Sequence, residues 1–270
     1  MRRERENKID VVIGIDIGSV TAKTVILDQR KQIVGYSVVE EGLVNEGSAI
    51  ASMRQALEKA GLSQEDVKFV VTTGYGRNLL HFHDKSFSEI SSHARGAHFL
   101  VPEVRTIIDI GGQDSKVISL NGGGKIETFQ MNDKCAAGTG RFLEVMSRAL
   151  KLSFSEMGEL GAHSQHPSHV SSMCTVFAES EIVSLAAQGI SKSDIIAGLY
   201  ESIARRTLTL MGMIQVRPKV MMTGGVAKNK QLVKVLEVMI KVEIVVPSEP
   251  QIVGALGAAL MAHQAMGEEA

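Results

Sequence analysis

Short apolar runs rich in Val and Ile alternate with glycine-containing polar turns near the start of the chain. The first run, residues 11–15, leads into the turn Asp16-Ile17-Gly18-Ser19. A run of this kind is typical of a buried strand. Because another apolar run follows after a few residues, the pattern predicts a β-hairpin whose turn carries Gly, Ser, Thr and Lys. Further strands are predicted at residues 24–27, 32–39 and 67–72, and an amphipathic helix at residues 47–60.

The same pattern returns later in the chain. Residues 106–121 again contain a β-branched apolar run, an Asp-Ile-Gly turn and a second apolar run. In each copy a lysine stands seven residues after the aspartate: Lys23 follows Asp16, and Lys116 follows Asp109. We interpret the match as an internal duplication, because it combines a motif with the type of element that carries it. It predicts an α/β protein with two related halves, each opening with a hairpin whose turn faces a common cleft.

A further glycine turn lies near the C-terminus. A predicted strand at residues 219–222 runs into Thr223-Gly224-Gly225, and a helix is predicted at residues 229–240. A strand, a glycine pair and a helix in this order leave backbone N–H groups free to meet a ligand. A short strand at residues 243–246 and a helix of small residues at 254–263 complete this part of the pattern.

The composition restricts the classes of function. The chain has 270 residues, of which 44% are hydrophobic, and a formal net charge of −1, which is ordinary for a globular protein. This charge, together with 4% aromatic residues and no Trp, argues against a broad nucleic-acid surface. No stretch is long and apolar enough to span a membrane. The charged N-terminus lacks the apolar run of a signal peptide, so we expect a cytoplasmic protein.

The two cysteines, Cys135 and Cys174, each precede a predicted helix, at residues 142–150 and 178–187. A helix N-terminus lowers the pKa of a thiol and stabilises an anion. Iron–sulfur clusters usually take four thiolates, so two per chain suggest a cluster shared between two copies. The competing interpretation is that both are small buried apolar residues, because none of the dense CxxC spacings is present.

The two Asp-Ile-Gly turns offer the chemistry of a nucleotide site. Their glycines and hydroxyl residues expose N–H donors to phosphate oxygens. Asp16 and Asp109 are suited to hold Mg²⁺, Lys23 to neutralise phosphate charge, and Gln113 or Asp114 to orient an attacking water. The sequence has no Walker A motif, and Asp-Ile-Gly leads into a strand rather than the helix of a dinucleotide-binding fingerprint.

A histidine run is the remaining candidate for metal binding. His163, His166 and His169 are spaced three residues apart beside Pro167. The proline and the polar neighbours favour a surface loop, because a solvated histidine needs no partner.

Seven motifs together resemble one family. In chain order they are GIDIGS, TGYGR, DIGGQDSK, MNDKCAAGTGRFL, CTVFAESE, MTGGVA and GALGAAL, and they extend over residues 14–260. This set is similar to the activator ATPases of 2-hydroxyacyl-CoA dehydratases, which are related to the ATPase subunits of benzoyl-CoA reductase. The resemblance implies an actin-like, sugar-kinase-like α/β ATPase fold with two duplicated subdomains around a nucleotide cleft. We expect a flexible tail at residues 1–10, an N-terminal subdomain at 11–105 and a C-terminal subdomain at 106–270.

The resemblance also implies cofactors and partners. It implies ATP with Mg²⁺, and a homodimer that shares one [4Fe–4S] cluster held by Cys135 and Cys174 of each chain. A reduced ferredoxin or flavodoxin is the expected electron donor, and a 2-hydroxyacyl-CoA dehydratase or related reductase the expected acceptor. No nucleic acid or membrane partner is expected.

Most of the implied site residues lie in the glycine turns. Catalysis is expected from Asp109, Gln113 and Asp114. The expected cofactor-binding residues are Asp16, Gly18, Ser19, Val20, Thr21, Ala22, Lys23, Gly111, Gly112, Gln113, Gly138, Thr139, Gly224, Gly225 and Gln251. Relatives often have Thr or Ser where this chain has Val20, and Thr21 restores a hydroxyl one position later.

Two other classes of function fit the same motifs. A small-molecule kinase of the actin-like fold would transfer phosphate to a metabolite and keep its cysteines for structural reasons. A non-catalytic regulator would bind a nucleotide without turnover. Both predict a colourless protein after purification without oxygen, whereas a bound cluster predicts a brown one.

Overall fold

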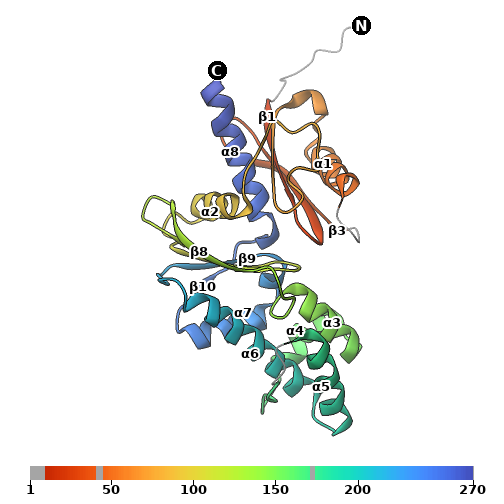
Figure 1. Cartoon of the computed structure of the whole chain (residues 1–270). Coiled ribbons are helices and arrows are strands. Elements are labelled where there is room, and N and C mark those ends of the chain that lie inside the picture. The colour runs from red at the N-terminus through yellow and green to blue at the C-terminus, as the bar shows by residue number, and fades with distance from the viewer. Residues whose placement is uncertain (1–9, 41–44, 171–173, 270) are drawn as a thin grey trace. The chain divides into compact units, whose positions relative to one another are not determined.

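Two five-stranded sheets, one in each half of the chain, organise the residues that the structure describes. The structure is a computed structural model that describes residues 10–40, 45–170 and 174–269 (Figure 1). It divides into a first unit, Met1–Pro102 with Gln251–Ala270, and a second unit, Glu103–Pro250. The predicted tail at residues 1–10 lies outside the described residues except for Asp10, whose carboxylate pairs with Lys68 at 3.1 Å.

The sheet of the first unit has the order β3-β2-β1-β4-β5. Its strands are β1 (Val11–Ile17), β2 (Thr21–Leu27), β3 (Ile33–Glu40), β4 (Val67–Thr73) and β5 (Lys85–Ser86). The first three strands pair antiparallel as a meander, and β4 joins β1 in parallel. The predicted hairpin is therefore confirmed, and strand β1 lies at the centre of the sheet, buried along its whole length.

Helices cover both faces of this sheet. Helix α1 (Glu46–Ala60) packs on the face that carries Ile13 and Ile15, and α8 (Val253–Glu269) packs on the face that carries Val12 (Figure 1). The alternation follows from the pleat, which points successive side chains to opposite faces. The 3₁₀ turn η1 (Gln64–Asp66) precedes β4, and helix α2 (Glu89–Leu100) packs against α8.

The close crossing of α2 and α8 depends on glycine. A methyl group added at Gly257 would lie 1.7 Å from the carbonyl oxygen of Ser92, and one added at Gly96 would lie 2.1 Å from that of Val253. No side chain fits at such distances, so the two helices meet backbone to backbone.

The position of α8 corrects the expected division of the chain. Residues 251–270 were expected in the C-terminal subdomain, whereas the structure assigns them to the first unit. The physical reason is that Ala255, Leu256 and Ala259 bury their side chains with Val12 and Val25 of the first sheet. Sequence proximity does not reveal a contact between such distant segments.

The second unit repeats the topology of the first. Its sheet has the order β10-β9-β6-β7-β8, formed by β6 (Thr106–Ile110), β7 (Ser115–Leu120), β8 (Ile126–Asn132), β9 (Val220–Thr223) and β10 (Ile244–Val245). Strands β6, β7 and β8 form an antiparallel meander, and β9 joins β6 in parallel, as β4 joins β1. This equivalence confirms the internal repeat that the sequence predicts.

The helices of the second unit gather around one large core that contains Ile108, Val117, Phe142, Leu199 and Leu236. They are α3 (Gly140–Leu150), α4 (Phe154–Gly161), α5 (Thr175–Ala187), α6 (Lys192–Met211) and α7 (Lys230–Ile240), with the 3₁₀ turn η2 (Gly225–Lys228). The 3₁₀ turn η3 (Pro250–Ile252) begins at the last residue of the second unit and continues into the first. None of the helices that the structure describes is long and apolar enough to cross a lipid bilayer.

Candidate active site

Asp16 lies at the end of β1 with 2% of its surface exposed. It stands directly across the hairpin from Lys23, whose Nζ lies 3.1 Å from Asp16 Oδ2. The other carboxylate oxygen, Oδ1, is buried and has no hydrogen-bond partner among the described residues. A buried carboxylate oxygen with unused acceptor capacity is suited to a cation or its bound water.

Backbone without side chains approaches this carboxylate from two directions. Gly74, with a φ of +85°, follows β4, and a methyl group added there would lie 2.5 Å from Asp16 Oδ1. A methyl group added at Gly254 would lie 3.1 Å from Asp16 Oδ2 and 2.9 Å from His93 Nε2. His93 is itself buried and lies 3.9 Å from Glu89. Sequence reasoning missed His93, because only the fold of the first unit places it near Asp16.

The second turn has a fully buried lysine at its centre. Lys116, with 1% of its surface exposed, lies 2.7 Å from Asp114 Oδ2 and 3.3 Å from Asp109 Oδ2. The other Asp109 oxygen, Oδ1, accepts a hydrogen bond of 2.7 Å from the Thr223 hydroxyl. Asp109 and Asp114 are therefore held by neighbours, whereas the side chain of Gln113 is exposed at the tip of the turn.

Gly224 repeats the role of Gly74 in the second unit. It follows β9, has a φ of +85°, and a methyl group added there would lie 2.3 Å from Ile110 O and 3.0 Å from Asp109 Oδ1. An L side chain rarely adopts this backbone conformation. Each unit thus places a left-handed glycine against the carboxylate of its Asp-Ile-Gly turn.

The other predicted contacts fall into three groups. Gly18 closes the first turn by donating its N–H to Thr21 O at 3.1 Å, and Ser19 and Val20 lie between the two residues. Ala22 lies in the following strand, β2. Gly138 has a φ of +84°, and Thr139 is buried directly before helix α3. Gln251 lies in η3, which the division of the chain places in the first unit.

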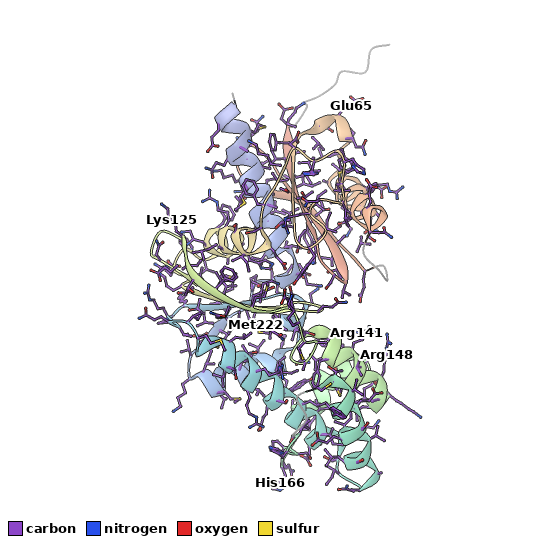
Figure 2. The ribbon with its side chains drawn as sticks, in the orientation of Figure 1. Glu65, Lys125, Arg141, Arg148, His166 and Met222 are labelled. Carbon is purple, nitrogen blue, oxygen red and sulfur yellow. The ribbon has the colours of Figure 1, made fainter. Side chains whose placement is uncertain are left out.

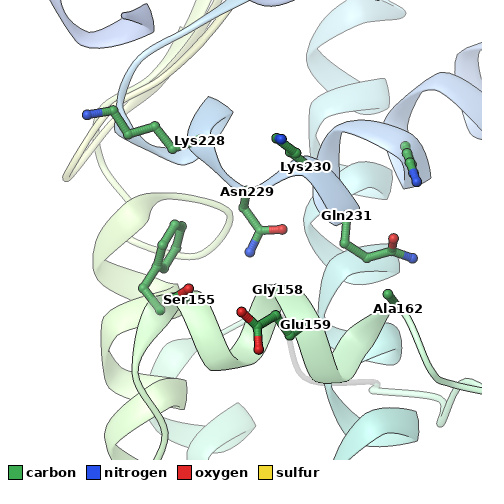
Figure 3. A pocket seen from close by; sticks show the side chains of 10 residues that line it. Ser155, Gly158, Glu159, Ala162, Lys228, Asn229, Lys230 and Gln231 are labelled. Atoms are coloured by element: carbon green, nitrogen blue, oxygen red, sulfur yellow. The ribbon is translucent and has the colours of Figure 1, made fainter.

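A cavity of about 540 Å³ opens beside η2 in the second unit (Figure 3). Helix α4 forms one side, and the segment that runs from the end of η2 into α7 forms the other. The lining residues are Phe154, Ser155, Gly158, Glu159, Ala162, Lys228, Asn229, Lys230, Gln231 and Lys234. Lys228 and the lining residues after it follow Gly224-Gly225 within a few positions, so the cavity and the late glycine turn belong to one segment of the chain. These lining residues were absent from the predicted site.

Both cysteines are free thiols placed ahead of helices, as the sequence predicts. Cys174 is exposed and is the N-cap residue of α5. Cys135 is half-buried against the core of the second unit and precedes the N-cap residue of α3, Thr139. Helices α3 and α5 pack against each other. The cysteine-bearing segments therefore lead into neighbouring helices.

The start of α3 is hydrogen-bonded to the second Asp-Ile-Gly turn. The N–H of Gly140 donates to Gly111 O at 2.9 Å, and the N–H of Arg141 donates to Gly112 O at 2.8 Å. Helix N-termini have N–H groups without intrahelical partners, and here the turn supplies two of the acceptors. A methyl group added at Gly140 would lie 3.1 Å from Gly111 O, so only a small residue fits.

Helix α5 exposes apolar side chains beside Cys174. Val176 and Phe177 are each 68% exposed, and Val183 is 53% exposed. On the neighbouring helix α3, Arg141 and Arg148 extend outward and both pair with Glu144 (Figure 2). Exposed apolar side chains that gather on one helix are typical of a protein interaction surface.

The histidine run lies in a surface loop, as predicted. His163, His166 and His169 are exposed, and Figure 2 shows His166 at the edge of the molecule. Asp194 of α6 holds this loop: its Oδ1 accepts from the Ser164 hydroxyl at 2.7 Å and from the His166 N–H at 3.0 Å. These hydrogen bonds, led by that of Ser164, lower the pKa of Asp194 to about 2.

Comparison with known proteins places the chain in a family. Residues 13–262 match the BadF/BadG/BcrA/BcrD ATPase family. The chain belongs to this ATPase family. The prediction drawn from the seven motifs is thereby confirmed.

Relatives of this ATPase agree with that assignment. It is 49% identical over 253 residues to the activator of lactoyl-CoA dehydratase of Anaerotignum propionicum, covering 94% of this chain and 97% of the relative. The structure of the activator of the 2-hydroxyisocaproyl-CoA dehydratase from Clostridium difficile, with bound ADPNP, matches with a TM-score of 0.92 and 45% identity, covering 96% of each chain.

A more distant structure supports the fold alone. A ROK family glucokinase from Streptomyces griseus matches this ATPase with a TM-score of 0.56 at 14% identity, covering 94% of this chain and 99% of that one. The predicted actin-like, sugar-kinase-like α/β fold is therefore confirmed.

Proposed function

We propose that this ATPase uses ATP to deliver a low-potential electron to a 2-hydroxyacyl-CoA dehydratase or a related reductase. The observation that carries the proposal is the pair of hydrogen bonds from Gly140 and Arg141 to Gly111 and Gly112. They join the Asp-Ile-Gly turn, which has the chemistry of a phosphate site, to the segment that contains Cys135. The dehydratase partner is inferred from the names of the relatives.

We propose that Asp16 holds Mg²⁺ with the ATP phosphates, directly or through water, whereas the carboxylate of Asp109 is occupied by Lys116 and Thr223. The unpartnered Oδ1 of Asp16 supports this role, because a buried acceptor without a partner is costly unless a ligand satisfies it. Lys23 neutralises phosphate charge from its position beside Asp16. The N–H groups of Gly18, Gly111 and Gly224 already donate to backbone carbonyls, so other N–H groups of these turns, such as that of Gly225, are the proposed donors to phosphate oxygens.

Gln113 is the proposed residue that orients the attacking water. Lys116 holds both Asp109 and Asp114, so their carboxylates are already committed within the turn. The exposed amide of Gln113 remains to contact a water molecule, and phosphoryl transfer depends mainly on such positioning. We expect Gln113→Ala to lower kcat at least tenfold with little change in the KM for ATP, which a steady-state assay measures. A variant with unchanged kcat would contradict this assignment.

The nucleoside of ATP is proposed to occupy the cavity between α4 and the start of α7. Its volume of about 540 Å³ falls within the range of small-molecule sites, and it follows the glycine turn proposed for the phosphates. Gly158→Leu places a larger side chain in this cavity while favouring the helix that carries it. We expect the variant to fold and to lose affinity for a fluorescent ATP analogue. Wild-type affinity would rule the cavity out.

Cys135 and Cys174 of two chains are the proposed ligands of one [4Fe–4S] cluster. The fit rests on two free thiols placed ahead of neighbouring helices, whose N-termini stabilise negative charge. When bound, such a cluster supplies one-electron transfer at low potential. The exposed apolar face of α5 beside Cys174 supports a second copy or the partner enzyme at this position. We further propose a ferredoxin or flavodoxin donor and a cytoplasmic location.

Iron analysis tests the cluster without relying on activity. Protein purified without oxygen is expected to be a brown dimer with about two irons and two sulfides per chain. Cys174→Ala is expected to lose the cluster and to retain ATP binding, because Cys174 is exposed and its loss leaves no cavity in the core. A Cys174→Ala protein with full iron content would refute the shared cluster. A colourless wild-type protein after attempted reconstitution would favour the kinase alternative instead.

A further inference from the structure

Tyr200 is a buried side chain that the proposed mechanism does not use. It lies on α6 and is among the largest fully buried side chains of the described residues. A buried hydroxyl needs a partner, and here the Nδ2 of Asn229 donates to it at 2.7 Å. Burial raises the pKa of Tyr200 to about 12, so the group remains a neutral hydroxyl at any working pH.

Asn229 is engaged from two sides. Its Oδ1 accepts the N–H of Leu232 at 3.0 Å and thereby caps the N-terminus of α7. Because the oxygen is committed to the cap, the amide nitrogen is the atom that faces Tyr200. Asn229 is also a lining residue of the cavity between α4 and α7 (Figure 3). One amide therefore joins α6, the start of α7 and the cavity wall.

Helix α4 packs closely over this pair. A methyl group added at Gly161 would lie 2.9 Å from Cε2 of Tyr200, and one added at Gly158 would lie 3.7 Å from Nδ2 of Asn229. The two glycines allow α4 to approach both partners of the hydrogen bond. Helix α4, which forms the opposite side of the cavity, therefore packs against both residues of the Tyr200–Asn229 pair.

We propose that Tyr200 is a positioning residue for nucleotide binding, which acts by fixing the Asn229 side chain in the wall of the cavity. The inference rests on the proposed function, in which the nucleoside of ATP occupies this cavity. An amide nitrogen has two hydrogens, so the bond to Tyr200 leaves one for a ligand. Without the tyrosine hydroxyl, only the cap bond from Leu232 holds the Asn229 side chain, so ordering the amide nitrogen lowers the affinity for a ligand.

Tyr200→Phe is the direct test, because it removes one hydroxyl and keeps the ring that fills the core. We expect the KM for ATP and the dissociation constant of a fluorescent ATP analogue to rise about fivefold, which corresponds to the loss of one hydrogen bond. The kcat is expected to stay within about twofold, since Tyr200 does not touch the phosphate turns. If Tyr200 had a structural role alone, Tyr200→Phe would lower the unfolding midpoint and leave the KM for ATP unchanged.

Thr207→Val is the matched control. Thr207 lies on the same helix, is buried, and donates its hydroxyl to the carbonyl of Ile203 at 3.2 Å. It is remote in sequence from the cavity-lining segments. Its KM for ATP is expected to equal that of the wild type. Equal KM values for Tyr200→Phe, Thr207→Val and the wild type would overturn the inference.

A second variant keeps the test decisive if Tyr200→Phe fails to fold. Asn229→Ser retains a good N-cap residue for α7 and loses the bond to Tyr200. We expect the same rise in KM, and an unchanged KM would overturn the inference.

The Gly158→Leu experiment distinguishes failure of the proposed nucleoside site from failure of the role proposed for Tyr200. Normal ATP affinity in Gly158→Leu refutes the cavity as the nucleoside site, whereas impaired Gly158→Leu with normal Tyr200→Phe refutes only the role of Tyr200.

Discussion

Lys23 and Lys116 occupy equivalent positions in the two hairpins but have different surroundings. Each stands across the hairpin from an aspartate, Asp16 or Asp109. Lys116 is fully buried and neutralises a second carboxylate, that of Asp114, whereas the side chain of Lys23 is 13% exposed and pairs with one. The internal repeat therefore contains the same Asp–Lys pair twice, with one carboxylate partner for Lys23 and two for Lys116.

This difference predicts unequal costs for the same substitution. Lys116→Met leaves two buried carboxylates without their cation, which costs about 3–5 kcal/mol of unfolding free energy. Lys23→Met is the matched control and is expected to cost about 1–2 kcal/mol, because Lys23 is partly exposed and pairs with a single carboxylate. Urea unfolding at pH 7 measures both. Equal costs would contradict the structural role assigned to Lys116.

At the residue scale, spacing predicted some contacts and could not predict others. A seven-residue spacing across a tight turn places Lys23 opposite Asp16, so the sequence suffices for that pair. The approach of Gly74 and His93 to the same carboxylate depends on β4, α2 and α8 packing in one unit. No local pattern carries that information, and both residues were absent from the predicted site.

Among the elements, the loop at residues 162–170 is held by one carboxylate of α6. Asp194 accepts from the Ser164 hydroxyl, from two loop N–H groups and from the Ser191 hydroxyl, and its own carbonyl accepts from the Ser168 N–H. A methyl group added at Gly198 would lie 1.8 Å from Ser168 O. The loop therefore follows the surface of α6 toward Val170, which is buried four residues before Cys174.

The attachment predicts a pH-dependent contribution to stability. The pKa of Asp194 is about 2 in the folded chain, below the ordinary value of about 3.9 for the unfolded one. A lowered pKa stabilises the fold above about pH 4, and this contribution is lost as the pH falls toward 2. We expect Asp194→Asn to lower the urea midpoint at pH 7. Between pH 4 and 2 the midpoints of the variant and the wild type are expected to converge. Glu201→Gln serves as a control, because Glu201 lies on the same helix and pairs with Arg205. If the difference in urea midpoint between Asp194→Asn and the wild type did not change with pH, the assignment would be contradicted.

The elements that the sequence predicted are those with continuous apolar runs or clear helical spacing. Strands β1 to β4, β6, β7, β9 and β10 and helices α1, α3, α5, α7 and α8 were found in this way. Strand β8 was missed because it lies at the edge of its sheet with mostly exposed residues. Helix α6 was missed although Ile195, Leu199 and Ile203 recur at helical spacing and are buried, so its signal was available.

For the whole molecule, the return of α8 to the first unit makes the two units unequal. The second unit is one continuous segment, whereas the first is completed by residues 251–270. Without α8, one face of the first sheet, with Val12, Val25 and Phe69, loses its cover. Burial of such side chains supplies most of the stabilisation of a small unit.

Fragments are therefore expected to behave differently. The fragment 103–250 is expected to unfold cooperatively on heating, because its core is complete. The fragment 1–102 is expected to lack a cooperative transition and to gain one when residues 251–270 are joined to it by a flexible linker. Circular dichroism during heating measures both. Cooperative unfolding of 1–102 alone would show that α8 is dispensable for the first unit.

The two hydrogen bonds between the Asp-Ile-Gly turn and the start of α3 have a thermodynamic consequence. If ATP in the turn alters the redox equilibrium of a cluster held by Cys135, linkage requires that reduction alter ATP affinity by the same factor. ATP and the electron then act on each other equally. The free energy that corresponds to the shift in midpoint potential on adding ATP must equal the free energy that corresponds to the ratio of nucleotide dissociation constants for the oxidised and reduced protein. The coupling is a state function, so its size is independent of which ligand arrives first.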